Sequence, residues 1–114
     1  MHALLDRGFR GLKLSAAHLL GRVVLDDPLF FPVWERMEAE GRVLAADLAA
    51  GEAQVPMLRR VLARFPRLPV ALGHFGMVTR GPWLEQIRLA RHEKVQVECG
   101  GIVWLFRSEG YPFP

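Results

Sequence analysis

The sequence predicts an α/β fold of parallel strands, because short apolar runs alternate with longer amphipathic ones and Pro or Gly stands at nearly every boundary. The strand-like runs begin about 30 residues apart, which is the spacing of a βαβ unit. With 114 residues, 51% of them hydrophobic, the chain can bury one ordinary core, so residues 1–114 are expected to form a single domain. The expected strands are residues 9–14, 42–48, 69–74 and 94–99.

The N-terminal half is expected to hold two helical segments around the first strand. Residues 2–8 resemble the end of a helix, closed by a glycine that can take the left-handed conformation. Residues 15–26 are expected to form a long, partly apolar loop. A helix then runs over residues 28–40, since Asp27 is a suitable N-cap and Pro28 suits the first helical position.

The C-terminal half repeats the alternation. Residues 52–65 carry apolar side chains at helical spacing, and Pro66 ends that helix. Gly81 and Pro82 are expected to open a third helix before the last strand. The side chains expected on its buried side are Trp83, Leu84, Ile87 and either Leu89 or Ala90.

Four parallel strands joined by helices form either a small doubly wound sheet or half of a (β/α)8 barrel, which typically needs about 250 residues. If all the helices cover one face of the sheet, the other face is bare and needs a partner surface. We therefore expect a homo-oligomer, with a symmetric dimer as the simplest way to bring four and four strands together.

Composition excludes several classes of protein. No apolar run approaches the roughly 20 residues of a membrane span, the N-terminus does not resemble a signal peptide, and Cys99 is the only cysteine. These features predict a cytoplasmic protein without disulfides or a membrane partner. The net charge of +3 is spread along the chain, usually with an acid nearby, so no nucleic-acid partner is expected.

Ionisable side chains stand at the expected carboxyl ends of all four strands, where α/β folds carry their chemistry. Asp47 lies in an otherwise apolar stretch, where its desolvation would be costly without a metal ion, a cation or good hydrogen bonds. The alternative is an N-cap or loop acid before the next helix. His74 lies among glycines at a strand end, where it would serve as a proton shuttle or metal ligand, or else as a hydrogen-bonded core histidine.

Two further residues are candidates for substrate binding. Lys13 projects either into the site as an electrostatic group or outward into solvent, and Glu98 is either a polar strand end or part of the site lining. Cys99 is expected to be buried and inert, because no basic neighbour in the sequence would favour its thiolate.

Strand alternation assigns the faces on which these groups lie. If Asp47 points toward the inner face, so do Val43 and Ala45. If His74 does, so do Val70 and Leu72. The sequence contains no Gly-rich phosphate loop, paired-cysteine zinc spacing or His-Glu-x-x-His motif that would decide the chemistry.

Several stretches, taken in order, resemble the amidohydrolase superfamily, and within it the amidohydrolase-related branch of metal-dependent TIM-barrel hydrolases and decarboxylases. Residues 8–14 resemble a fourth barrel strand, and Asp26-Asp27-Pro28 resembles the start of the helix before the fifth. Residues 64–68 resemble the approach to the sixth strand, and residues 72–76 resemble its His-x-Gly end. The resemblance covers nearly the whole chain and implies strands four to seven of a TIM barrel.

The resemblance also implies roles for residues. His74 matches the histidine of the sixth strand, a metal ligand in some members and a general acid/base in others. Asp47 falls where the fifth strand normally supplies a metal-binding histidine, and this departure leaves a carboxylate that can still ligate zinc. The His-x-His pair of the first strand and the aspartate of the eighth have no counterpart, since the chain is expected to span only the middle of the barrel.

Two hypotheses follow. In the first, the chain is an amidohydrolase-like metal-dependent hydrolase that acts on a small carboxylated or cyclic substrate with a divalent metal ion, zinc in the first instance. His74 is then the catalytic residue or a ligand, Asp47 a ligand, and Lys13 and Glu98 the substrate-binding residues. In the second, it is a non-catalytic assembly module or pseudoenzyme remnant of that family.

Overall fold

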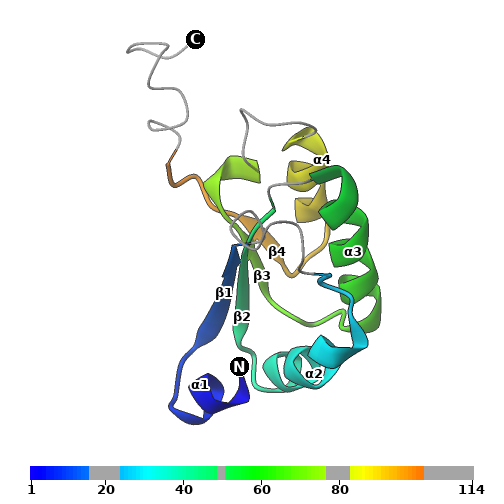
Figure 1. The fold of residues 1–114 in the computed structure, drawn as a ribbon. Coiled ribbons are helices and arrows are strands. Elements are labelled where there is room, and N and C mark those ends of the chain that lie inside the picture. Colours follow the sequence, from blue (N-terminus) through cyan, green and yellow to red (C-terminus); the bar gives the residue numbers. More distant parts are fainter. Residues whose placement is uncertain (16–23, 49–50, 77–82, 102–114) are drawn as a thin grey trace.

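The computed structural model describes residues 1–15, 24–48, 51–76 and 83–101. Its four strands form one sheet in the order β1-β2-β3-β4, with all neighbouring strands parallel (Figure 1). The predicted α/β fold of parallel βα repeats is therefore confirmed. The strands are β1 (Gly11–Ser15), β2 (Val43–Asp47), β3 (Val70–Leu72) and β4 (Val95–Val97).

Helices separate the strands along the chain. Asp27 begins the first of them as predicted, since its carboxylate accepts a hydrogen bond from the backbone N–H of Leu29 at 2.9 Å. The first turn is a 3-10 helix, and the α-helix follows it directly. The helical elements are α1 (His2–Asp6), η1 (Pro28–Phe30), α2 (Phe31–Ala39), α3 (Gly51–Arg64), η2 (His74–Gly76), α4 (Trp83–Arg88) and η3 (Leu89–Arg91).

The core lies between the sheet and the helices α2, α3 and α4, which all stand on one side of the sheet (Figure 1). One register row of the sheet supplies buried side chains from every strand, and Trp34, Met37 and Leu58 of the helices are also fully buried. Burial of this apolar surface is the main force that holds the layers together. The row consists of Leu12, Leu44, Val70 and Val95.

The opposite face of the sheet has no helix over it among the described residues (Figure 1). Its side chains are small or polar apart from Val43, and Lys13, Val43 and Gln96 are exposed. The expected asymmetry, helices on one face and a bare second face, is therefore present in the described part of the chain.

Two expectations about burial are wrong. Leu84 of α4 is 50% exposed, while Gln86 is 2% exposed because its amide donates a 2.6 Å hydrogen bond to the carbonyl of Leu48. This bond satisfies the polar group inside the core, which hydropathy spacing alone cannot foresee. Cys99 is exposed rather than buried. Gly81, Pro82 and most of the expected loop, residues 16–23, lie outside the described residues.

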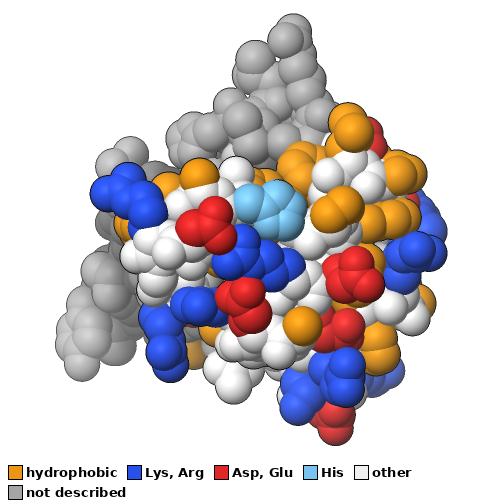
Figure 2. All heavy atoms as spheres, turned by 90° about the horizontal axis from the view of Figure 1, so that it is seen from below, with side chains coloured by type: hydrophobic (Ala, Val, Ile, Leu, Met, Phe, Trp, Pro, Cys, Tyr) orange, Lys and Arg blue, Asp and Glu red, His pale blue; other side chains and the backbone are white. Residues whose placement is uncertain are grey.

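The face of the molecule in Figure 2 carries lysine and arginine side chains interspersed with aspartate and glutamate. Among the described residues, surface ion pairs join Arg36 to Asp6 and Glu40, and Arg42 to Glu40. Within the described residues, no helix has both the length and the hydropathy that a membrane crossing would need.

Candidate functional site

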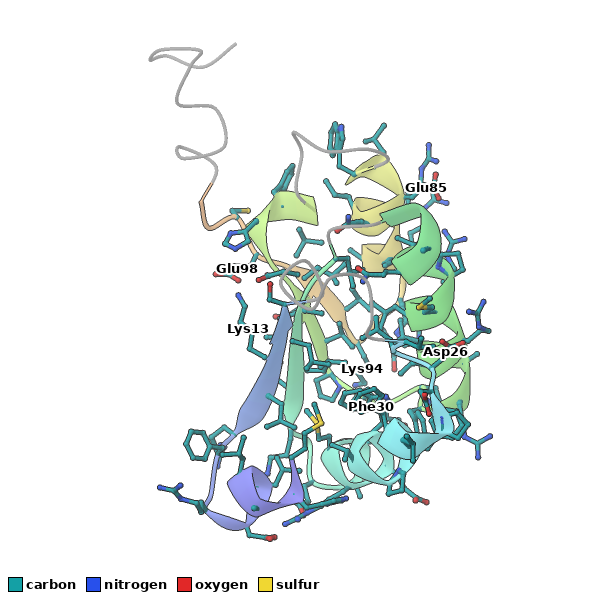
Figure 3. All side chains as sticks on the ribbon, viewed as in Figure 1. Lys13, Asp26, Phe30, Glu85, Lys94 and Glu98 are labelled. Atoms are coloured by element: carbon teal, nitrogen blue, oxygen red, sulfur yellow. The ribbon has the colours of Figure 1, made fainter. Side chains whose placement is uncertain are left out.

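The candidate site is the rim at the carboxyl ends of the four strands. Lys13 lies in β1, Asp47 ends β2, His74 follows β3 by two residues, and Glu98 follows β4 directly. Since the strands are parallel, these positions share one end of the sheet. Figure 3 shows Lys13 and Glu98 on the side of the sheet away from the helices.

Asp47 is the buried member of the rim, with 8% of the residue exposed. Its Oδ2 lies 3.2 Å from the Nζ atom of Lys13, whose side chain is 53% exposed. Its Oδ1 is buried and has no hydrogen-bond partner within the described residues. An unpaired buried carboxylate oxygen is costly, so this atom is a natural position for a cation or a proton donor.

Gly73 provides the space that the Asp47 carboxylate occupies. A Cβ atom at position 73 would overlap Oδ1 of Asp47, and Oε2 of Glu98 would lie 3.8 Å from it. The carboxylates of Asp47 and Glu98 therefore both lie beside Gly73. The close approach of a side chain to the backbone requires glycine here.

The side chain of His74 does not lie where strand alternation predicts. Alternation places His74 on the face of Leu72 and Val70, which are buried on the helix side. The strand ends at Leu72, however, and both His74 (φ 56°) and Phe75 (φ 50°) adopt left-handed backbone conformations. This turn brings Nε2 of His74 to 3.8 Å from Oδ1 of Asp47. The expectation that Val70, Leu72 and His74 share the inner face is therefore wrong.

Left-handed conformations cost on the order of 1–3 kcal/mol for a residue other than glycine, and they persist where the surrounding structure enforces them. Here the backbone N–H of Phe75 donates a 2.8 Å hydrogen bond to the carbonyl of Glu98, and that of Gly76 donates to Gly73 at 3.2 Å. The first bond fastens the turn to the end of β4, and the second closes the turn on itself. The strained turn thus holds the imidazole over the rim.

The hydrogen bond made by Nδ1 of His74 determines which ring nitrogen carries the proton. Nδ1 lies 3.2 Å from the carbonyl oxygen of Gly100. A carbonyl accepts hydrogen bonds and cannot donate them, so Nδ1 carries the proton of this bond. In the neutral ring, Nε2 is then the acceptor nitrogen, and it lies near Oδ1 of Asp47. Two acceptors face each other across 3.8 Å, an arrangement that a cation or an added proton between them would stabilise.

The glycines after β4 leave room for this ring. A Cβ atom at Gly101 would stand 2.9 Å from Nδ1 of His74, and Gly101 has φ 78°, a value that side chains other than glycine rarely adopt. The sequence prediction noted the glycines on either side of His74 but missed the contact of Gly73 with Asp47 and the part played by Gly100 and Gly101. The Gly100-Gly101 pair directly after a strand-end glutamate was the available signal.

The acceptor pair fits a divalent metal ion as two of its ligands. Zinc binds carboxylate oxygens and imidazole nitrogens at about 2.0–2.2 Å, so one ion can contact two atoms separated by 3.8 Å. Within the described residues, no group of three or more His, Cys, Asp or Glu side chains has the geometry to hold a metal ion. A complete shell therefore needs ligands beyond Asp47 and His74.

The rim thus brings three predicted residues into one cluster: Lys13 contacts Asp47, and Asp47 faces His74. Glu98 is exposed beside them rather than bonded to them. Asp47 ends the strand and pairs with Lys13 across the sheet. The alternative, that Asp47 is an N-cap or loop acid before the next helix, depends on residues 49–50, which lie outside the described part.

Comparison with known proteins identifies a family for the whole chain. The family model described as Amidohydrolase matches residues 1–114. No match was found among curated proteins or among solved structures.

Proposed function

Because the chain belongs to the amidohydrolase family, we propose that it is a metal-dependent hydrolase that acts on a small carboxylated or cyclic substrate at the rim of Lys13, Asp47, His74 and Glu98. The observation that carries this proposal is the facing pair of acceptors, Oδ1 of Asp47 and Nε2 of His74, at 3.8 Å. A carboxylate oxygen and an imidazole nitrogen are both atoms that bind zinc in proteins.

Asp47 and His74 would hold the metal ion, zinc in the first instance because it accepts both oxygen and nitrogen ligands. A divalent cation at this position supplies a Lewis acid that activates water and polarises a carbonyl. The bond from Nδ1 of His74 to Gly100 orients the ring and makes Nε2 the better donor atom. The burial of Asp47 excludes bulk water from one side of the pair.

Lys13 and Glu98 would bind the substrate. The ammonium of Lys13 is half exposed and reaches over the bare face, so it can attract a substrate carboxylate without leaving Asp47. The exposed carboxylate of Glu98 can accept hydrogen bonds from polar groups of the substrate. Where His74 is not a ligand, its Nε2 can accept a proton from the attacking water.

A second candidate function, a non-catalytic assembly module, is favoured by the Lys13–Asp47 ion pair. An ammonium 3.2 Å from Oδ2 already offsets the charge that a metal ion would need. With only two candidate ligands among the described residues, the isolated chain would then hold its fold without binding metal.

Metal content separates the two candidates. The chain is purified without chelator and its divalent metal is measured, and the apo protein is titrated with Co²⁺, whose visible spectrum reports imidazole coordination. The matched pairs are Asp47→Asn with Asp26→Asn as control, and His74→Gln with His92→Gln as control. The hydrolase proposal expects stoichiometric metal in the wild type and both controls, and its loss in the two rim variants. Wild-type protein without metal, and without a Co²⁺ spectrum on titration, would favour the assembly module.

A further inference from the structure

Gln86 of α4 is a polar side chain in the core that the proposed mechanism does not use. The residue is 2% exposed, and Nε2 of its amide donates a 2.6 Å hydrogen bond to the carbonyl oxygen of Leu48. A buried amide costs free energy unless it is hydrogen-bonded, and an apolar side chain of similar size would fill the space without that cost. The place of the bonded carbonyl therefore indicates what this amide does.

The bonded carbonyl lies directly beside the rim. Leu48 follows Asp47, the last residue of β2. The pairing of β2 with β3 ends at Ala46 and Leu72, so β3 offers no partner to the carbonyl of Leu48. The amide of Gln86 supplies a donor from α4 instead. It thereby fixes the backbone one residue after the carboxylate of the acceptor pair.

Gln86 also contacts the turn that carries His74. Gly76 ends this turn, two residues after His74, and is buried. A Cβ atom at Gly76 would stand 3.1 Å from Cβ of Gln86 and 3.1 Å from the carbonyl oxygen of Trp83. The turn therefore packs against α4 so closely that a side chain at position 76 would press on Gln86.

An aromatic contact joins the same two elements. The ring of Phe75, the residue after His74, lies 6.4 Å from the ring of Trp83 at the start of α4, measured between centroids. Aromatic rings at this separation attract each other. In Figure 1, α4 lies toward the end of the molecule that carries the rim, whereas α2 lies at the other end. The first turn of α4 is thus a support for the rim.

We propose that Gln86 is a positioning residue of the rim, which holds Asp47 and His74 in register with each other. Its amide bonds to the residue after Asp47, and its Cβ packs against the turn that carries His74. The two acceptors lie 3.8 Å apart, and the groups of a binding site must be held to within about 0.5 Å of the productive geometry. This inference deepens the proposed hydrolase function, on which its metal-binding test rests.

The two halves of the pair differ in how much they depend on Gln86. The turn has a second fastening, the 2.8 Å hydrogen bond from the N–H of Phe75 to the carbonyl of Glu98, which does not involve α4. Loss of the Gln86 amide would therefore release the end of β2 more than the turn. Asp47 would lose its register with His74, while the bond from Nδ1 of His74 to the end of β4 would persist.

Co²⁺ titration of Gln86→Met tests the role, because methionine has a similar size but cannot donate to Leu48. The affinity should fall about 10–100-fold, the loss that is typical when a group supporting a metal ligand is removed. Gln86→Asn is a second variant: it keeps an amide, but one methylene shorter it should not reach Leu48, so the same loss is expected. Circular dichroism verifies that each variant folds.

The control for a general loss of stability is Met37→Ala. Met37 is fully buried in α2, which precedes β2 at the end of the strands away from the rim. This variant should be less stable than the wild type and bind Co²⁺ equally well. Wild-type affinity in the Gln86 variants would overturn the positioning role, and so would an equal loss of affinity in Met37→Ala.

A measurement without metal separates this inference from the hydrolase proposal. In NMR spectra of the metal-free protein, Gln86→Met should shift the carboxyl ¹³C signal of Asp47, while Nδ1 of His74 remains the protonated ring nitrogen. Met37→Ala should change neither. An Asp47 signal that is the same in Gln86→Met and in the wild type would overturn the role of Gln86. A wild-type protein that binds no Co²⁺ would overturn the hydrolase proposal alone, and the Asp47 signal would then decide the role of Gln86.

Discussion

The ammonium of Lys13 lies 3.2 Å from Oδ2 of Asp47, and the two side chains differ sharply in exposure, 53% against 11%. The carboxylate is enclosed by the sheet, by the Gly73 backbone and by His74, and the lysine neutralises it from the solvent side. One oxygen of Asp47 is thus satisfied and the other, Oδ1, is left near the acceptor nitrogen of an imidazole. Because Oδ2 contacts Lys13 and Oδ1 faces His74, substitutions at the rim should affect both the stability of the protein and its affinity for metal.

Removing the charge of Lys13 should have opposite effects on stability and on metal affinity. In Lys13→Met the apolar stem remains, but the buried carboxylate loses its partner, so the free energy of unfolding should fall by about 1–2 kcal/mol. The affinity for Co²⁺ should rise about tenfold at low salt, because a competing positive charge is gone. Denaturant unfolding and Co²⁺ titration measure the two effects.

The control for this substitution is Lys94→Met, since Lys94 is also partly exposed and its carboxylate contact, to Glu93, is a long 3.9 Å. This variant should change neither quantity. Equal Co²⁺ affinity in Lys13→Met and in the wild type would contradict a direct competition between lysine and metal for Asp47.

Two histidines should show opposite tautomers in their neutral forms. Nδ1 of His74 faces the Gly100 carbonyl and must donate, whereas Nδ1 of His92 accepts a 3.2 Å hydrogen bond from the backbone N–H of Lys94. In ¹⁵N NMR spectra of the metal-free protein at alkaline pH, Nδ1 of His74 and Nε2 of His92 should be the protonated atoms. Protonation of His74 at Nε2 would contradict the assignment of Nε2 and Oδ1 of Asp47 as a pair of acceptors.

The pH dependence of stability should include a contribution from Glu40. Hydrogen bonding from the Arg36 side chain, followed by the charges of Arg36 and Arg42, holds the pKa of Glu40 below its ordinary value. A carboxyl group with a lowered folded-state pKa stabilises the protein above its unfolded-state pKa and loses that contribution as the pH falls through the folded-state value. Glu40→Gln should therefore be less stable than the wild type at neutral pH and equal to it in acid.

Thermal unfolding across the acid range tests this contribution. Glu35→Gln, on the exposed side of α2, is the control and should follow the wild-type curve at every pH. A constant difference between Glu40→Gln and the wild type down to the lowest pH would show that the carboxylate charge is not its origin.

The parts of the fold that depend on local chemistry could be predicted from the sequence. The N-cap at Asp27 and the run of residues 42–48 both correspond to elements close to their expected bounds, because capping and apolar patterning act within a few residues. The expected strand at 69–74 is shorter, Val70–Leu72, since the chain leaves the sheet at Gly73.

The geometry of the site could be predicted only in outline. The parallel order of the strands brought Asp47 and His74 to one edge, as expected. The inward turn of His74 could not be foreseen, because it depends on left-handed conformations at His74 and Phe75, two residue types that favour other regions. Hydrogen bonds to the end of β4 impose those conformations. These bonds join residues more than 20 positions apart, so the sequence around His74 gives no sign of them.

A methyl group at Gly73 should damage the site more than the same group at Gly100. The Cβ of Gly73→Ala would collide with Oδ1 of Asp47, which is buried and cannot withdraw, so the variant should lose about 1–3 kcal/mol of stability and the Co²⁺ signal. The Cβ of Gly100→Ala would meet Oε1 of Glu98 at 2.9 Å, the exposed end of a flexible side chain that can rotate away. Denaturant unfolding of both variants should therefore show a loss at position 73 and little change at position 100. Equal losses of stability in the two variants would contradict this explanation, because they would show that the collision with Asp47 is not what makes glycine necessary at position 73.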